Sequence, residues 1–277
     1  MMEVICYLGP MSDEPAAGGA EAPVTVGQRP DMVGKALHVL RIIGTAADGM
    51  TLSELARETG YPLSTTHRLV ATLMREGFVD LDEATRHYQV GLMVFALARK
   101  VAAGRGFEDI ALPVLRRLAA ETRESTLMSV LDDDRQLYVA HVQGPLQINV
   151  IGEPGTLGPL HCTSMGKVLI AFAPRPVRER LVDSVELTRL APNTVTDREA
   201  FAQDISEVRA RGFALSDQEH EEGVRAIGVP VMGVDGAAMA AISVAAPSFR
   251  RSVADLIDML PTMTQAAREL AARLPAR

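Results

Sequence analysis

Residues 52–79 read LSELARETGYPLSTTHRLVATLMREGFV, and this stretch decides the fold of the N-terminal part of the chain. It holds two apolar patterns with helical spacing, which are separated by Gly-Tyr-Pro at 60–62 because this tripeptide turns the chain. Thr51 and Glu54 have the spacing of a capping box, so the first helix is predicted to begin directly after Thr51. The second helix is predicted over 63–76 and ends before a glycine.

The flanking segments complete a small domain. Upstream, apolar residues with helical spacing over 33–43 predict a further amphipathic helix. Downstream, residues 78–81 and 87–90 predict two short strands joined by the polar turn 82–86. Three helices followed by a hairpin are the elements of a winged helix-turn-helix, which the sequence predicts over residues 30–91.

Polar side chains occupy the outward face of the second helix of this motif. Leu69, Val70 and Leu73 fall on the face that packs against the preceding helix, so the N-terminal half of 63–76 presents its polar residues outward. A recognition helix meets DNA base edges at this position, arginine suits guanine or phosphate, and hydroxyls suit phosphates or base edges. The predicted DNA contacts are Ser53, Ser64, Thr65, Thr66, His67 and Arg68, with Arg86 at the hairpin tip reaching a minor groove.

Only residues 30–105 have a charge balance that is compatible with binding a polyanion such as DNA. The net charge is -7, but residues 30–105 hold 8 acidic and 9 basic side chains, so DNA binding requires the basic ones to share a face. Helix-turn-helix patterns also arise by chance, with exposed polar residues that are merely solvated. An alternative function therefore stays open, a small-molecule sensor or enzyme whose N-terminal helices bind protein instead of DNA.

The N-terminal segment and the cysteines bear on location. Residues 1–29 are rich in Gly, Ala, Pro and Glu without periodicity, which predicts a disordered tail. An acidic residue stands where a signal peptide needs a positive region, and no uncharged apolar run approaches the ~18 residues of a membrane span. Cys6 and Cys162 have no CxxC spacing, which fits a reducing compartment. The sequence predicts a cytoplasmic protein without membrane contact.

Residues 106–277 alternate helical and strand-like patterns. Helices are predicted at 110–122, 163–172, 199–212 and about 253–274. Strands are predicted on both sides of the turn at 132–135, at 148–151, and in a hairpin closed by Val-Asp-Gly at 234–236. Hairpins interleaved with helices favour an antiparallel sheet covered by helices, so the fold class is α+β.

Four blocks of the sequence, in order, resemble the IclR family of bacterial transcriptional regulators. They are the segment 33–79 that begins VGKALHVL, GPLHCTSMGKVLIAF at 158–172, RGFALSDQEHEEGVRAIGVPV at 211–231, and AAISVAAP at 240–247. The resemblance implies an N-terminal DNA-binding domain, a linker helix over 92–105 and an effector-binding domain over 106–277 with a profilin-like or GAF-like fold. It further implies a ligand-responsive regulator of a catabolic operon that binds palindromic operators as a homodimer or homotetramer, and it leaves repressor and activator equally open.

The resemblance also implies where an effector binds. The segment 158–167 turns at a Gly-Pro pair and begins a helix whose N-terminal amides form an anion site. In the resembled family this segment donates backbone amides to a small organic acid. The implied effector contacts are Leu160, Ser164, Met165, Ser216, Asp217, Ala226, Ser243 and Ala245.

Two of these positions depart from the family's known small-acid pockets. Ala226 stands where those pockets have a cysteine, and Ala245 stands where they have a second serine. Methyl groups in place of a thiol and a hydroxyl remove hydrogen-bonding partners and enlarge the pocket. A less polar effector is therefore expected, an aromatic or longer aliphatic carboxylate.

No catalytic residue, cofactor or metal is predicted. His161 and Cys162 are neighbours in sequence, whereas a catalytic dyad needs side chains that face one another and a third group that orients them. The six histidines show no HxxxH or HExxH spacing, and residues 220–222 are predicted to form a solvated turn. No glycine-rich phosphate loop opens a helix, so a nucleotide cofactor is not expected.

Overall fold

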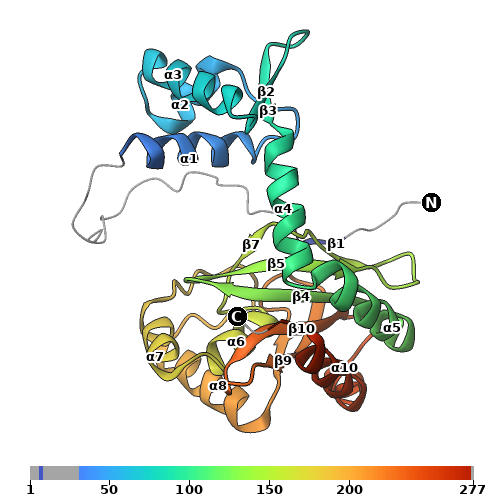
Figure 1. Cartoon of the computed structure of the whole chain (residues 1–277). Coiled ribbons are helices and arrows are strands. Elements are labelled where there is room, and N and C mark those ends of the chain that lie inside the picture. The colour runs from blue at the N-terminus through green and yellow to red at the C-terminus, as the bar shows by residue number, and fades with distance from the viewer. Residues whose placement is uncertain (1–5, 9–30, 276–277) are drawn as a thin grey trace. The chain divides into compact units, whose positions relative to one another are not determined.

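The computed structural model describes residues 6–8 and 31–275, which form two compact units (Figure 1). One unit extends from residue 31 to residue 102, and the other begins at residue 103 and includes the short strand β1 (Cys6–Leu8). Helix α4 (Leu92–Gly104) lies at the junction of the two units in the chain, within the range 92–105 predicted for a linker helix. In the part of the chain that the structure describes, no helix is both long and apolar enough to cross a membrane.

The N-terminal unit is a winged helix-turn-helix, as predicted. Its elements are α1 (Met32–Ile43), α2 (Leu52–Thr59), α3 (Leu63–Arg75), β2 (Val79–Asp82) and β3 (His87–Val90). The Thr51 side chain accepts a hydrogen bond from the Glu54 amide and the Glu54 side chain bonds back to Thr51, which confirms the capping box. The two strands pair in antiparallel register from Val79 opposite Val90 and form the wing.

Apolar side chains at helical spacing hold the three helices together. The buried ones are Val39, Ile43, Leu55, Leu69, Val70, Leu73 and Val79. Helix α3 supplies Leu69, Val70 and Leu73 from one face, because residues three and four apart lie above one another on a helix. Its opposite face is therefore free to meet a partner.

The C-terminal unit is built on a six-stranded antiparallel sheet, which confirms the α+β class. The strands are β4 (Ser125–Asp132), β5 (Arg135–Val142), β7 (Leu157–Gly158), β8 (Ala214–Asp217), β9 (Val224–Met232) and β10 (Ala238–Pro247). Their order across the sheet is β7-β5-β4-β10-β9-β8. Outside this sheet, β6 (Val150–Gly152) pairs in parallel with β1.

Helices cover both faces of this sheet. They are a π-helix (Phe107–Ala111), α5 (Leu112–Thr122), α6 (Ser164–Ala171), α7 (Arg175–Ser184), α8 (Arg198–Arg211), α9 (Val253–Ile257) and α10 (Leu260–Arg273). Helices α5 and α10 pack on one face, where Leu115, Ile242 and Leu270 are buried together. Helix α6 packs on the other face, with α8 behind it, around Leu127 and Leu169.

Several elements of the C-terminal unit differ from the predictions. The helix predicted over 253–274 is divided into α9 and α10, because Pro261 stands in the first turn of α10 and cannot donate an amide to continue a helix. Helix α7 was not predicted. Strand β8 was not among the predicted strands, and it forms through pairing of Ser216 with Ala226 of β9, which no local pattern reveals.

The structure describes three residues of the segment predicted to be a disordered tail. Cys6, Tyr7 and Leu8 form β1, which pairs with Val150, Ile151 and Gly152. The prediction does not hold for these three residues, because pairing with β6 gives one edge of the segment backbone hydrogen-bond partners. The other residues of 1–29 lie outside the described residues.

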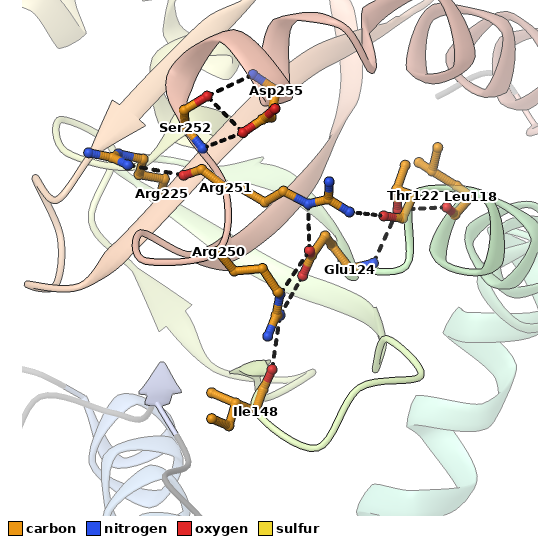
Figure 2. Close-up of polar contacts among 9 residues, drawn as sticks. All are labelled: Leu118, Thr122, Glu124, Ile148, Arg225, Arg250, Arg251, Ser252 and Asp255. Carbon is orange, nitrogen blue, oxygen red and sulfur yellow. Dashed lines mark hydrogen bonds and ion pairs between the residues drawn. The ribbon is translucent and has the colours of Figure 1, made fainter.

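A buried carboxylate ties the segment after β10 to the end of α5 (Figure 2). The Glu124 side chain is 0% exposed, and its two oxygens lie 2.6 Å from Arg250 Nη2 and 2.8 Å from Arg251 Nε. The same guanidinium groups also donate to the backbone carbonyls of Ile148 and Thr122. This cluster therefore joins three segments that are far apart in sequence.

Candidate DNA-binding surface and effector pocket

Six of the seven predicted DNA contacts lie at the surface of the N-terminal unit. They are Ser53 on α2, Ser64, Thr65, His67 and Arg68 on α3, and Arg86 in the hairpin, and Thr65 alone among them is half-buried. The N-cap residue of α3 is Pro62, which makes no side-chain hydrogen bond to the first amides of the helix. The first two amides of α3, those of Leu63 and Ser64, precede the amides that bond to the Pro62 carbonyl, so a phosphate can accept from them.

The prediction that Thr66 contacts DNA is wrong. Its side chain is 0% exposed, and its hydroxyl donates to the Pro62 carbonyl at 3.2 Å. Thr66 precedes Leu69, Val70 and Leu73 by three, four and seven residues, so it shares their inward face. This spacing was visible in the sequence and could have excluded Thr66.

The wing presents Arg86 from a tight turn. The Asp82 carboxylate accepts hydrogen bonds from the Ala84 and Thr85 amides, and the bond from Ala84 is the main cause that lowers the pKa of Asp82. Arg86 has a φ of 60°, which is a left-handed conformation that ends the turn. Its guanidinium lies 2.8 Å from Glu83, but both side chains are largely exposed, so this ion pair is weak and a phosphate can displace it.

A pocket opens on the sheet face that α6 covers. It contains about 390 Å³ of space not filled by protein, part of which is open to solvent. Its lining is Leu127, Tyr138, Thr163, Ser164, Met165, Ser216, His220, Glu221, Val224, Ala226, Ser243 and Ala245. The pocket thus lies between the N-terminus of α6, the strands β8 to β10 and the loop that follows β8.

Strand β9 forms the floor of the pocket. Its alternate residues Val224, Ala226 and Gly228 share the face that α6 covers. A Cβ atom on Gly228 would lie 2.9 Å from the Ser164 carbonyl and 3.2 Å from the Met165 amide nitrogen. Because glycine has no Cβ, the N-terminus of α6 can rest directly on the strand.

The first amides of α6 are available at this end of the pocket. Thr163 caps the helix, and its hydroxyl accepts the Gly166 amide at 3.0 Å. The amides of Ser164 and Met165 come before the first amide that the helix itself can satisfy. The positive end of the helix dipole adds to them, so this helix end can hold an anion.

Six of the eight predicted effector contacts meet in this pocket. They are Ser164, Met165, Ser216, Ala226, Ser243 and Ala245. Leu160 is a correction, because it is fully buried beneath α6, where its carbonyl would be 2.3 Å from a Cβ atom on Gly166. Asp217 is also a correction, because its carboxylate lies outside the lining and binds Arg225 Nε at 2.6 Å.

Sequence reasoning missed the other half of the lining. The missed residues are Leu127, Tyr138, Thr163, His220, Glu221 and Val224. The prediction of a solvated turn at 220–222 was wrong for His220 and Glu221, which are half-buried, and holds for Glu222, which is exposed. The two-residue alternation of β9 could have added Val224 to Ala226, whereas Leu127 and Tyr138 come from strands distant in sequence.

Several polar groups of the lining are already bonded within the protein. The Ser216 hydroxyl donates to the Cys162 carbonyl at 2.7 Å. The Gln136 amide nitrogen lies 3.2 Å from the Tyr138 hydroxyl and 2.7 Å from the Thr163 hydroxyl, so it donates to both. These bonds fix the walls and leave fewer polar side chains for a ligand.

No lysine or arginine lines the pocket. Burial, with a smaller contribution from His161, lowers the pKa of His220 to about 4, so the imidazole is neutral at physiological pH. Burial also raises the pKa of Glu221. An anion in this pocket must therefore rely on helix amides and hydroxyls.

The buried lysine of α6, Lys167, already has three polar partners within the protein. Lys167 Nζ lies 2.7 Å from Asp204 Oδ2, 2.6 Å from Glu219 Oε2 and 3.2 Å from the Leu215 carbonyl. Burial raises the pKa of Glu219 although Lys167 opposes this shift. The ammonium group is thus held by two carboxylates and does not serve the pocket.

The lowered pKa of His220 is expected to make the unfolding free energy of the protein fall at acidic pH. In the unfolded chain its pKa returns toward 6.5, so between about 6.5 and about 4 the unfolded state binds more protons and stability falls as pH falls. Glu219 and Glu221, with raised pKa values, act in the opposite direction, and comparison with a variant isolates His220. Between about pH 7 and about pH 5, wild type is expected to lose more unfolding free energy than His220→Phe in urea titrations. Equal losses would contradict this assignment.

The neighbours His161 and Cys162 do not form a dyad. His161 Nε2 lies 2.9 Å from the Thr188 carbonyl, and Nδ1 has no partner. Burial raises the pKa of the Cys162 thiol to about 12, so the thiol stays protonated. Over residues 6–8 and 31–275, no group of three or more His, Cys, Asp and Glu side chains is placed to hold a metal ion.

A winged helix-turn-helix joined to a separate domain that carries a pocket is typical of one class of protein, the ligand-responsive transcriptional regulators. Comparisons with known proteins support this class. The description "IclR helix-turn-helix domain" matches residues 32–83, and "Bacterial transcriptional regulator IclR C-terminal" matches residues 100–272. The chain therefore belongs to the IclR family.

Individual relatives span nearly the whole chain. The HTH-type transcriptional regulator BhcR of Paracoccus denitrificans is 34% identical and covers 92% of this chain and 90% of its own. A solved structure described as an IclR regulator from Silicibacter sp. TM1040 has a TM-score of 0.80 at 29% identity, over 89% of this chain and 97% of its own. An IclR homologue from Microbacterium hydrocarbonoxydans, solved in complex with 4-hydroxybenzoate, has a TM-score of 0.76 at 24% identity, over 87% and 98% of the two chains.

Proposed function

We propose that this IclR-type regulator controls a catabolic operon in the cytoplasm in response to a monocarboxylic acid that carries an aromatic ring or a longer aliphatic chain. Residues 30–91 bind DNA, residues 92–105 link the domains, and residues 106–277 bind the effector. The observation that carries the proposal is the N-terminus of α6, whose amides at Ser164 and Met165 open onto a pocket floored by Ala226 and Ala245.

The electrostatics of the pocket indicate that the effector carries one acid group. The buried cation Lys167 is already bound by two carboxylates, and no lysine or arginine lines the pocket. Helix amides bind an anion without a fixed positive side chain. One carboxylate at Ser164 and Met165 is therefore the charge that this pocket accommodates best.

The apolar walls of the pocket indicate that the rest of the effector is apolar. Leu127, Val224, Ala226 and Ala245 supply methyl and methylene surface along the floor. The family member from Microbacterium hydrocarbonoxydans that was solved with 4-hydroxybenzoate supports an aromatic acid.

Filling the floor of the pocket is expected to weaken effector binding. In Ala226→Leu the larger side chain occupies the space between α6 and β10, so the dissociation constant for the acid rises by about tenfold or more. Calorimetric titration of wild type and variant measures this change. Ala210→Leu, on the exposed surface of α8, is the control and should bind the acid like wild type. Equal affinities of Ala226→Leu and wild type would place the effector elsewhere.

The N-terminal unit is proposed to bind a palindromic operator as part of a homodimer or homotetramer. Two recognition helices reach half-sites about one helical turn of DNA apart when the protein has two-fold symmetry. Exposed apolar residues of α4 support self-association, since Leu92 is 79% and Phe95 65% exposed. The protein acts by binding alone, without catalysis.

Salt dependence separates this function from the alternative in which the N-terminal helices bind protein. Each phosphate that the protein neutralises releases counterions, so the logarithm of DNA affinity falls linearly with the logarithm of salt concentration. The full-length protein is expected to bind the region upstream of its own gene with this dependence in mobility-shift titrations. Absence of specific binding at low salt would favour a protein-binding module.

A further inference from the structure

The pocket has two polar ends, and only one of them is accounted for by an acid group. At the first end, the amides of Ser164 and Met165 lie over Gly228. Ser243 pairs directly opposite Gly228 on β10, so its hydroxyl belongs to the same end. Amides and a hydroxyl are donors, and donors suit a carboxylate.

The second end lies at the other extremity of β9. Val224 is four residues from Gly228 on the same face of the strand, which places the two Cα atoms about 13 Å apart at ~3.3 Å per residue. The Val224 amide donates to the Glu221 carbonyl at 3.3 Å, so a tight turn places Glu221 and His220 directly before this end of the strand. Both side chains line the pocket.

The chemistry of the second end differs from that of the first. His220 is a neutral imidazole, and its Nδ1 is buried without a hydrogen-bond partner. Glu221 adds a carboxyl group. The nearby cation Arg225 is already committed, since its guanidinium binds Asp217 and donates to the Ser248 carbonyl. This end therefore offers hydrogen-bonding groups but no positive charge.

We propose that His220 and Glu221 determine effector specificity by binding a hydroxyl group at the end of the effector remote from its carboxylate and by excluding a second carboxylate. The inference rests on the proposed acid site and adds to it the nature of the second polar group. A hydroxyl both donates and accepts, so it can pair with an imidazole nitrogen and with the carboxyl group of Glu221. A second carboxylate would be desolvated beside another acid without a cation to compensate it.

Three acids of one scaffold test this specificity on the full-length protein. Benzoate carries the first group alone, 4-hydroxybenzoate adds the hydroxyl, and terephthalate adds a carboxylate at the same position. By calorimetric titration, 4-hydroxybenzoate is expected to bind wild type about tenfold more tightly than benzoate. Terephthalate is expected to bind at least about tenfold more weakly than benzoate.

Two variants assign the effect to the named side chains. In His220→Phe the ratio of the benzoate and 4-hydroxybenzoate dissociation constants is expected to fall to about one, because the imidazole nitrogen is lost. In Glu221→Gln the discrimination against terephthalate is expected to fall to about threefold or less, because the acid is replaced by a neutral amide. Glu222→Gln changes the neighbouring exposed residue and should keep both wild-type ratios.

The outcomes separate this inference from the proposed acid site. If none of the three acids binds wild type, the proposed acid site fails and this inference fails with it. If benzoate and 4-hydroxybenzoate bind equally, or terephthalate binds as tightly as benzoate, the acid site stands and the specificity assignment is wrong. A wild-type preference that survives both His220→Phe and Glu221→Gln would also overturn the assignment.

Discussion

A Glu124→Ala variant is expected to lose about 3 kcal/mol of unfolding free energy in the C-terminal unit. The Glu124 carboxylate is 0% exposed and compensates two guanidinium groups, those of Arg250 and Arg251 (Figure 2). Removing one partner of a buried ion pair leaves uncompensated charge. The expected loss is at the lower end of the range for such changes, because the arginine side chains are 20% and 27% exposed and retain some solvation.

Urea unfolding of wild type and variant measures this loss. Glu179→Ala is a matched control, because Glu179 binds Arg175 at 2.7 Å on α7 with side chains that are 58% and 79% exposed. Exposed pairs of this kind contribute about 0 to 1 kcal/mol, so the control should unfold close to wild type. A Glu124→Ala loss no larger than that of the control would show that the cluster in Figure 2 does not hold the three segments together.

An Arg68→Ala variant is expected to bind its operator more weakly by roughly 1 to 3 kcal/mol. Arg68 is exposed on the open face of α3, beside Ser64 and His67, where a recognition helix meets base edges. Mobility-shift titration at fixed salt gives the change in dissociation constant, and effector binding should be unchanged, since the pocket belongs to the other unit.

Arg180→Ala provides the control for the loss of one positive charge. Arg180 is an exposed residue of α7, and its guanidinium lies 3.1 Å from Asp133 within the C-terminal unit. Its removal lowers net charge by the same amount as Arg68→Ala and should leave operator affinity close to wild type. Unaltered operator affinity in Arg68→Ala would remove Arg68 from the DNA-binding surface.

Local patterns were sufficient for most of the N-terminal unit. The capping box at Thr51 and the spacing of Leu69, Val70 and Leu73 are short-range signals, and both are confirmed by the structure. The same spacing places Thr66 in the core, although Thr66 was predicted to contact DNA. In the C-terminal unit, β8 depends on pairing with β9, a contact that residue order alone does not specify.

The pocket shows the same division between local and non-local information. The acid end was predicted because a helix N-terminus at Ser164 and Met165 can be read from one segment. Leu127 and Tyr138 lie in the pocket lining because strands β4 and β5 pair within the sheet. His220 lies there because it stands in the loop that turns into β9 at Val224. The hydrogen bond from the Val224 amide to the Glu221 carbonyl belongs to the turn before β9, and the sequence pattern alone did not reveal that this turn borders the pocket.

An acid bound in the pocket formed by α6 and β8 to β10 is expected to change the affinity of this regulator for its operator. The most direct test titrates operator complexes of wild type and Ala226→Leu with the monocarboxylic acid that raises the melting temperature of wild type most. A ligand changes an equilibrium only through different affinities for its two states, so the variant should respond at about tenfold or higher acid concentration while binding free operator like wild type. Identical midpoints for the two proteins, or operator complexes that do not respond to the acid at all, would contradict the account.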